Sequence, residues 1–368
     1  MRIGIPRETK TMEFRVGMIP DAVSGIVHEG HEVFVESQAG IGSGFSDEAY
    51  EAVGARIVDR RVAWHDTELI VKVKEPQSEE VDHMREGQTL FTYLHLAANR
   101  DLTLQLCERG VTAIAYETIQ QPDGSFPVLA PMSEVAGRLA AQVGVGLLQK
   151  DRGGKGLLLG GVPGVARGRV CVIGGGTVGI NAARVSHALG AEVDVFDIDL
   201  KRLTYLYDIF HGELNTLYAD PANIARSVAH ADLVVGAVYV NGRRAPTLVT
   251  DEMVRQMEPG SVVVDVAVDQ GGCVETIHPT THADPTYRVH DVVHYGVANM
   301  PGAVPQTSTR ALTNTTLPFI QRMASRGIAT AVREDPALSL GTNVWNGSLV
   351  HEGVAISLDL DATSIPAG

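Results

Sequence analysis

The stretch RVCVIGGGTVGINAARVSHALGAEVDVFDID, residues 169–199, decides the fold expected for this chain. It begins with a short apolar run rich in β-branched residues, which leads into Gly174, Gly175 and Gly176. A segment with helical character starts near Thr177, and a second apolar strand ends at Asp197. This order predicts a strand, a glycine turn, a helix and a second strand, as in the βα units of a parallel sheet.

Gly174, Gly176 and Gly179 have the spacing G-x-G-x-x-G, and Asp197 follows 18 residues after the last of them. Between a strand and a helix, such glycines allow a tight turn, the approach of a pyrophosphate and close helix–strand packing. The carboxylate suits ribose hydroxyls, and the helix N-terminus near Thr177 offers free N–H groups and a positive dipole end. We expect a dinucleotide site; the alternative is a glycine turn in an ordinary βα unit.

Asp197 also bears on which dinucleotide binds. Its carboxylate would repel a 2′-phosphate, so the sequence favours NAD over NADP. Arg202 lies five residues further along and has the chemistry to bind adenosine or a phosphate, which leaves NADP open.

The composition is that of a globular protein with two domains. The chain has 368 residues, of which 44% are hydrophobic and 20% charged, and a single core rarely grows to this size. The net charge of −14 disfavours nucleic acid and anionic membranes as partners. No apolar run is long enough to span a bilayer, and the N-terminal MRIGIPRETK lacks the apolar core of a secretory signal.

The cysteines Cys107, Cys171 and Cys273 are odd in number and have no CxxC spacing. A reduced, cytoplasmic compartment is the simplest interpretation, with the thiols as small core residues. We expect neither a disulfide framework nor a zinc or other metal site.

Strand and helix patterns alternate along the chain, which predicts an α/β fold. The expected strands of the first third are MRIGIP, EVFVES, LIVKVKEP, TLFTYLHL and TAIAYETI; the expected helices are DAVSGIVHEGH and SDEAYEAVGA, the latter capped by Ser46. Residues 131–151 predict a long helix, and 152–168 a loop or hairpin. Small residues permit close packing of that helix: Gly137, Ala140, Ala141 and Gly144.

A second alternating series runs from Val170 to about Val297, and the pattern is helical again after Pro301. These last helices are too few for a third domain, so we expect them to return to the first. The prediction is therefore two Rossmann-like domains with parallel sheets, the NAD-binding domain being inserted between two segments of a substrate domain. The expected boundaries are 1–130 and 300–368 for the substrate (catalytic) domain and 131–299 for the NAD-binding domain.

Two lysines stand out in LIVKVKEP, where Lys72 and Lys74 share one face of an otherwise apolar strand. Lys74 falls at the carboxyl end of the strand, where open α/β sheets place ligands, and a lysine there suits a carboxylate or carbonyl. For Lys72 alone we favour the alternative, a lysine that guards an edge strand.

Three further residues are candidates for chemistry. His95 follows a strand expected to be buried, beside the small residues Ala97 and Ala98, although most such histidines have structural roles. Asp269 comes at a strand end before a Gly–Gly turn, again at the ligand edge. Asp265 lies within the apolar run and needs hydrogen-bond partners, so we interpret it as structural or close to the cofactor.

Taken together, these segments resemble the alanine dehydrogenase family. The similar blocks occur in order over nearly the whole chain: MRIGIPRETKTMEFRVGMIP, VKVKEPQ, YLHLAAN, APMSEVAGRLA, the glycine stretch, DVAVDQGG and VANMPGAVPQTSTRALTN. The same superfamily includes the NAD-binding part of proton-translocating transhydrogenase, which usually extends into membrane segments.

The resemblance implies roles for individual residues. Arg15, which alone would be an unremarkable surface arginine, and Lys74 would bind the substrate carboxylate and carbonyl oxygen. His95 and Asp269 would be the acid/base pair. Residues expected to contact NAD are Ser133, Gly174, Gly176, Thr177, Val178, Gly179, Asp197, Arg202, Val238, Tyr239, Ala267, Val268, Asp269, Val297, Ala298, Asn299 and Met300.

The implied reaction is the reversible, NAD-dependent oxidative deamination of L-alanine to pyruvate and ammonium, by a homohexamer. The long helix at 131–151 is a candidate surface for packing between subunits. The alternatives are an NAD-dependent dehydrogenase of another amino acid, such as a saccharopine- or lysine-type enzyme, and a transhydrogenase-type NAD(H)-binding component. A non-catalytic NAD sensor is a further class, and would bind the cofactor without turnover.

Overall fold

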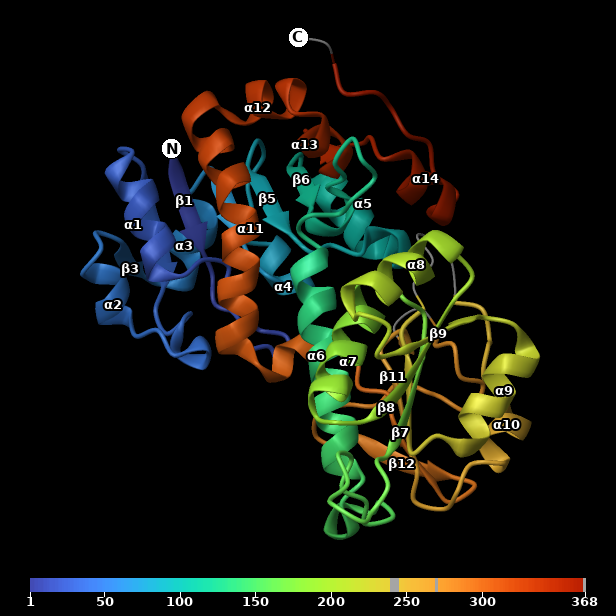
Figure 1. Ribbon diagram of the computed structural model, residues 1–368. Helices are drawn as coiled ribbons and strands as arrows, with labels where there is room; N and C mark the ends of the chain where they lie inside the picture. Colours follow the sequence, from blue (N-terminus) through green and yellow to red (C-terminus); the bar gives the residue numbers. More distant parts are fainter. Residues whose placement is uncertain (239–244, 269–270, 367–368) are drawn as a thin grey trace. The chain divides into compact units, whose positions relative to one another are not determined.

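The computed structural model describes residues 1–238, 245–268 and 271–366 (Figure 1). The chain divides into two compact units: unit 1 comprises Met1–Met132 with Val304–Gly368, and unit 2 comprises Ser133–Ala303. Each unit is built around one sheet.

Unit 1 has an eight-stranded sheet in the order β15-β14-β6-β5-β4-β1-β2-β3. Its strands are β1 (Arg2–Ile5), β2 (Glu32–Glu36), β3 (Arg56–Val58), β4 (Leu69–Val71), β5 (Thr89–Thr92), β6 (Thr112–Ala115), β14 (Thr342–Trp345) and β15 (Ser348–Leu349). The first six are parallel, with β1 between β2 and β4. From β1 the strands β2 and β3 follow on one side, and β4, β5 and β6 follow on the other. The strand order therefore reverses between β1 and β4, and parallel sheets bind ligands at the carboxyl ends of the strands at such a switch point.

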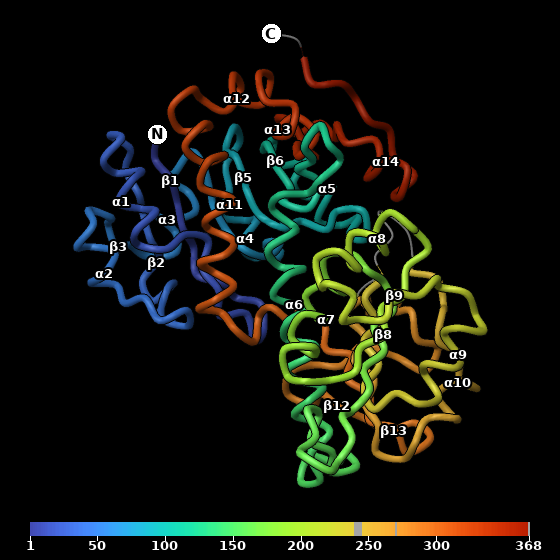
Figure 2. Tube along the Cα trace, viewed as in Figure 1, coloured from blue at the N-terminus to red at the C-terminus, as the bar shows by residue number. Residues whose placement is uncertain are grey.

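Helices cover both faces of this sheet because side chains alternate along its strands. Leu69 and Val71 of β4 join one core, whereas Ile70 joins the other. The helices of unit 1 are α1 (Pro20–His28), α2 (Asp47–Glu51), α3 (Arg60–His65), α4 (Ser78–Val81), α5 (Arg100–Glu108), α11 (Pro305–Arg326), α12 (Ile328–Glu334), α13 (Pro336–Gly341) and α14 (Glu352–Leu358). Short 3-10 turns are η1 (Ile41–Ser43), η2 (Leu96–Ala98) and η3 (Tyr116–Thr118). Figure 2 shows the C-terminal α11 beside the N-terminal α1, with which it shares the first core.

Unit 2 has a seven-stranded sheet in the order β12-β13-β11-β10-β7-β8-β9. Its strands are β7 (Arg169–Ile173), β8 (Glu192–Asp197), β9 (Asn215–Tyr218), β10 (Leu233–Gly236), β11 (Val262–Asp265), β12 (Thr286–Val289) and β13 (Val292–Tyr295). Its helices are α7 (Thr177–Ala188), α8 (Leu200–Ile209), α9 (Pro221–His230) and α10 (Asp251–Arg255), with the 3-10 turns η4 (Lys150–Arg152) and η6 (Met300–Ala303); α6 (Ala130–Leu147) starts in unit 1 and continues into unit 2. The strand order places a second switch point between β7 and β10.

The α/β class and the two mostly parallel sheets are confirmed, and Ser46 caps α2 by accepting the Ala49 N–H at 3.4 Å. The sheets are mixed, however: β12 is antiparallel to β13, and β14 is antiparallel to β6 and β15. The edge-strand interpretation of Lys72 is wrong, because β4 lies between β1 and β5. Within the described ranges, no helix is long and apolar enough to cross a membrane.

The small residues of α6 pack inside unit 2. A Cβ on Gly137 would lie 2.1 Å from the Val178 carbonyl oxygen, and one on Gly144 would lie 2.5 Å from Leu233. Ala140 and Ala141 are fully buried. Gly137 and Gly144 therefore allow the close approach of α6 to α7 and β10, which confirms the close packing expected from the small residues. The helix as a packing surface between subunits stays a prediction.

Candidate functional site

Arg15 lies in the loop after β1 and is buried, with only 2% of its surface exposed. Both carboxylate oxygens of Glu13 accept hydrogen bonds from its guanidinium, one from Nε at 2.7 Å and one from Nη2 at 2.6 Å. The third nitrogen, Nη1, lies 3.2 Å from the Met132 sulfur. Burial alone would lower the pKa of Arg15, but hydrogen bonds and charge from Glu13 outweigh burial and raise it. The site therefore holds a permanent, desolvated cation, which a surface arginine would not provide.

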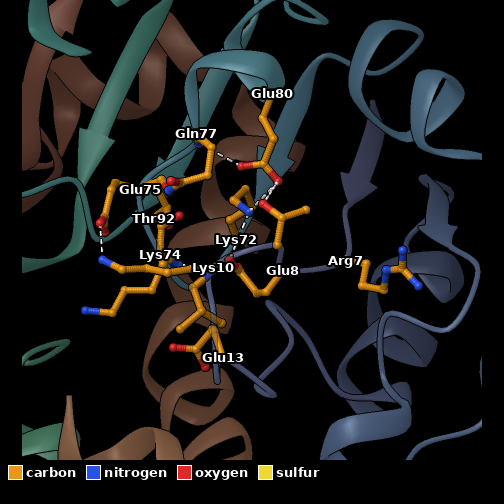
Figure 3. A network of polar contacts seen from close by, with 12 residues as sticks. Arg7, Glu8, Lys10, Glu13, Lys72, Lys74, Glu75, Gln77, Glu80 and Thr92 are labelled. Atoms are coloured by element: carbon orange, nitrogen blue, oxygen red, sulfur yellow. Dashed lines mark hydrogen bonds and ion pairs between the residues drawn. The ribbon is translucent and has the colours of Figure 1, made fainter. Parts of the chain in front are cut away.

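Lys74 follows the carboxyl end of β4 and is half-buried. Its pKa is lowered, first by burial and then by the positive charges of Arg15 and Lys10, against the opposing charge of Glu75. Lys10 is paired with Glu75 (Figure 3). Among the described residues, the Lys74 ammonium has neither a hydrogen bond nor an ion pair, so its donors are available to a ligand.

His95 adopts the left-handed conformation, with φ 51° and ψ 36°. Glu117 stabilises this turn: its Oε1 accepts the His95 N–H at 2.6 Å, and both of its oxygens accept the Leu94 N–H at 3.2 Å. The imidazole stacks on Tyr93 with ring centroids 6.0 Å apart, and its Nδ1 lies 3.8 Å from Glu117 Oε1. The His95 side chain is 48% exposed, and Glu117 fixes the backbone that carries it.

The glycine turn of unit 2 has the geometry that a pyrophosphate needs. Gly174 has φ +103°, and a Cβ there would meet the Ala237 carbonyl oxygen at 2.7 Å; one on Gly179 would lie 1.8 Å from the Gly174 carbonyl oxygen. In contrast, a Cβ on Gly176 would have no atom of the described residues within 4 Å. Gly176 is the N-cap of α7 and has no side chain to occupy the first N–H groups of the helix, beginning at Thr177. Open space in front of free helix donors suits an anion.

Asp197 stands at the end of β8, beside this turn. Its Oδ2 accepts the Gly175 N–H at 2.8 Å and its Oδ1 accepts the Asp199 N–H at 2.9 Å. A carboxylate oxygen can accept more than one hydrogen bond, so both oxygens retain capacity for ribose hydroxyls. Arg202 is exposed, and its guanidinium lies over the Tyr205 ring, 5.8 Å from the centroid.

Asp265, at the end of β11, is a structural residue. It is fully buried and accepts the N–H groups of Ala267 at 2.8 Å, Cys273 at 2.7 Å and Val274 at 3.1 Å. Burial raises its pKa although these hydrogen bonds oppose the shift. The carboxylate thus hydrogen-bonds Ala267 and Cys273, which lie on either side of Asp269 in the sequence. Asp269 itself, like Tyr239, lies outside the described residues.

The other expected cofactor residues lie in unit 2, at or near the carboxyl edge of its sheet. Val268 is buried and Ala267 half-buried after β11, while Val238 follows β10. After β13, Val297 forms a parallel bridge with Thr280, and Asn299 adopts φ 58° just before η6. The remaining expected positions are Ser133 on α6, Val178 on α7, Ala298 after β13 and Met300 at the start of η6.

The sequence interpretation missed the two carboxylates that hydrogen-bond Arg15 and the backbone of His95. Glu13 stands two residues from Arg15, a spacing that puts two side chains on one side of extended backbone. Glu117 follows β6 at the same sheet edge as His95. The signal for Glu117 was present in the sequence, because an acidic residue close after a buried strand requires partners. Glu13 lies in the loop after β1, and its only signal was the spacing to Arg15.

Comparisons with known proteins agree with this geometry. Family models described as "Alanine dehydrogenase/PNT, N-terminal domain" and "Alanine dehydrogenase/PNT, C-terminal domain" match residues 4–136 and 140–352. The chain is 54% identical to the alanine dehydrogenase of Bacillus subtilis over 100% of its length and 97% of that protein. It is 53% identical to the alanine dehydrogenase of Staphylococcus haemolyticus over 99% and 98%.

Solved structures are similar as well. An L-alanine dehydrogenase superposes with a TM-score of 0.95 at 54% identity, covering 98% of this chain and 99% of the other. A transhydrogenase from Sinorhizobium meliloti has a TM-score of 0.85 at 24% identity, covering 95% and 100%, which is a likeness of fold alone.

Proposed function

The chain belongs to the alanine dehydrogenase/PNT family, and we propose that it is an NAD-dependent L-alanine dehydrogenase. The reaction converts L-alanine, NAD⁺ and water into pyruvate, ammonium, NADH and a proton, reversibly. The observation that carries the proposal is the buried Arg15 close to Lys74, whose ammonium has no partner among the described residues, in a chain whose unit 2 has a glycine turn suited to a pyrophosphate.

Arg15 and Lys74 bind the substrate in this proposal. Arg15 is fixed by Glu13, so a carboxylate of the substrate meets a guanidinium that is already oriented. Lys74 stabilises negative charge on the carbonyl or carbinolamine oxygen. Its lowered pKa also makes it a better proton donor near neutrality than an ordinary lysine.

His95 and Asp269 perform the proton transfers. When hydride leaves the substrate Cα, an imine forms, water adds to it and ammonia departs, so each step moves a proton. An imidazole is the usual side chain for such transfers, which favours His95, and Glu117 fixes the His95 backbone through its N–H. Asp269 is proposed to deprotonate the ammonium group or water.

Bound NAD supplies the hydride acceptor. The open space at Gly176 and the free N–H groups of α7 fit its pyrophosphate, and Asp197 fits its ribose hydroxyls, which favours NAD over NADP. The other cofactor residues expected from the sequence remain part of this proposal.

We also propose a cytoplasmic homohexamer whose NAD-binding domain spans residues 131–299. The buried Cys171 and Cys273 are free thiols, which suits a reducing compartment. The subunit number rests on the family resemblance, and light scattering coupled to size exclusion measures it directly. A mass other than six times 39.3 kDa contradicts it.

The first experiment measures NADH oxidation by the purified protein with pyruvate, with and without ammonium, and again with NADPH. Rapid oxidation only with ammonium supports reductive amination. Oxidation without ammonium indicates a hydroxy-acid dehydrogenase, and none in either case favours another amino acid or a transhydrogenase-type component. His95→Ala and Asp269→Ala should each lower turnover by about 10²–10⁴-fold, and near-normal turnover in either variant refutes its role.

A further inference from the structure

A buried carboxylate at the switch point of unit 1 has no part in the chemistry described so far. Glu8 follows β1, and its side chain is only 2% exposed. Its Oε2 accepts a hydrogen bond from Lys72 Nζ at 2.9 Å. Its Oε1 accepts the backbone N–H groups of Val73 at 2.7 Å and Lys74 at 3.3 Å.

The Glu8 carboxylate stands beside Val73 where a neighbouring strand would otherwise supply a backbone carbonyl oxygen. β1 and β4 pair through Ile3 and Gly4, but they separate toward their carboxyl ends. The Lys72 N–H still bonds the Phe91 carbonyl of β5, so the next N–H, that of Val73, faces β1 and has no strand partner there. One carboxylate oxygen of Glu8 accepts this N–H and also that of Lys74, so neither is left without an acceptor.

Lys72 keeps this carboxylate in place. It is fully buried, and its ammonium also contacts Glu80 at 3.4 Å (Figure 3). The same ammonium lies over the Trp64 ring, 5.5 Å from the centroid. Glu80 has other partners, since it accepts from Thr9 at 2.9 Å and from the Gln77 N–H at 2.8 Å. Glu8 thus has Lys72 as its countercharge, whereas Glu80 also receives hydrogen bonds from the neutral Thr9 and Gln77.

Lys74 is held from the opposite side as well. Its carbonyl oxygen accepts the Thr92 hydroxyl at 3.0 Å, from the end of β5. The backbone of Lys74 is therefore fixed at its N–H by Glu8 and at its carbonyl by Thr92, while its ammonium has no partner among the described residues.

We propose that Glu8, charge-paired with Lys72, is a positioning residue that fixes the backbone of Lys74 and so aims its ammonium at the substrate oxygen. The inference deepens the proposed function and rests on it for the identity of the substrate. Lys72, the second lysine of the strand, then acts through Glu8 and touches no substrate. A buried ion pair is retained here because an apolar pair would leave two N–H groups without an acceptor.

Two double variants separate this role from a merely structural one. Glu8→Gln with Lys72→Met removes both charges but keeps an amide oxygen that can accept the two N–H groups. Glu8→Ala with Lys72→Met removes the acceptor too. We expect kcat/KM for pyruvate to be about 10–100-fold lower in the second variant than in the first, with KM for NADH alike within about twofold.

A second measurement is independent of the substrate. Hydrogen exchange of the peptide containing Val73 and Lys74 should be protected in the Gln/Met variant and faster in the Ala/Met variant. If the wild type does not use pyruvate, the proposed function fails, yet this difference in exchange still decides whether Glu8 fixes the segment. Equal exchange and equal kcat/KM for pyruvate in the two double variants overturn the inference.

Two further variants distinguish a loss of positioning from a loss of folding. Thr92→Val removes the other anchor of Lys74 with little change in volume, and should lower kcat/KM for pyruvate several-fold without changing KM for NADH. Asp335→Asn is the control, because Asp335 is also a buried acceptor paired with an arginine but lies at the start of α13. It should lower the melting temperature and leave kcat/KM for pyruvate unchanged; a fall like that of the Ala/Met variant contradicts the inference.

Discussion

Substituting Gly176 and Gly179 separately by alanine tests the cofactor turn, because the two glycines serve different purposes. A Cβ on Gly179 would lie 1.8 Å from the Gly174 carbonyl oxygen, whereas real Cβ contacts stay above 3.0 Å, so α7 must shift by about 1.2 Å (3.0 − 1.8). Such overpacking costs about 1–3 kcal/mol. For a unit of this size each kcal/mol lowers the melting temperature by about 2–4 °C.

Gly176→Ala should behave differently. Its backbone has φ −70°, which alanine adopts without strain, and its Cβ meets no atom of the described residues within 4 Å. Alanine stabilises by about 0.4–1 kcal/mol through the unfolded state but is a poorer N-cap than glycine, so the two effects oppose and the stability should stay within about 1 kcal/mol of the wild type. The methyl group would stand where the pyrophosphate must approach, so the Kd for NADH should rise about tenfold or more.

The assay is a fluorescence titration of NADH for both variants, with a calorimetric melt of each free protein. Weak NADH binding with normal stability in Gly176→Ala, and lower stability in Gly179→Ala, is the expected pattern. Wild-type affinity for NADH in Gly176→Ala would refute the view that a phosphate approaches this backbone. An unchanged melt of Gly179→Ala would refute the close contact between α7 and the turn.

Three other perturbations probe the candidate site. Asp197→Ser removes the charge that repels a 2′-phosphate, so the ratio of kcat/KM for NADPH to that for NADH should rise at least about tenfold; an unchanged ratio contradicts the selectivity argument. Glu117→Gln weakens the support of His95 and should lower kcat about tenfold in steady-state assays while KM for NADH stays constant, whereas the exposed Glu108→Gln should change neither. Since burial and then the charges of Arg15 and Lys10 lower the pKa of Lys74, its ammonium is lost as pH rises through a value below the ordinary lysine range, and kcat/KM for pyruvate should fall there. Lys10→Ala removes one of these cations, so the alkaline limb of that pH profile should move to higher pH; a shift to lower pH would show that Lys74 is not the titrating group.

The local features of this protein were predictable from its sequence. The glycine spacing predicted the turn between β7 and α7, because close approach and positive φ are properties of a few neighbouring residues. Alternating apolar runs predicted most of the parallel strands, and the long pattern at 131–151 predicted α6. Lys74 and His95 were found because polar residues at strand ends fall on one edge of a parallel sheet.

The tertiary structure alone decided which groups meet at that edge. Glu8 accepts a hydrogen bond from Val73, which lies 65 residues away in the sequence, and Glu117 accepts one from His95, which lies 22 residues away. Lys72 and Lys74 share one face of the strand in the sequence, yet Lys72 is buried in an ion pair, whereas the Lys74 ammonium has no partner among the described residues, because their surroundings come from different strands and loops. The antiparallel β12, β14 and β15 also depend on the sheets that receive them. Sequence patterns report the conformation of a segment, whereas burial, pairing and pKa depend on distant segments brought into contact by folding.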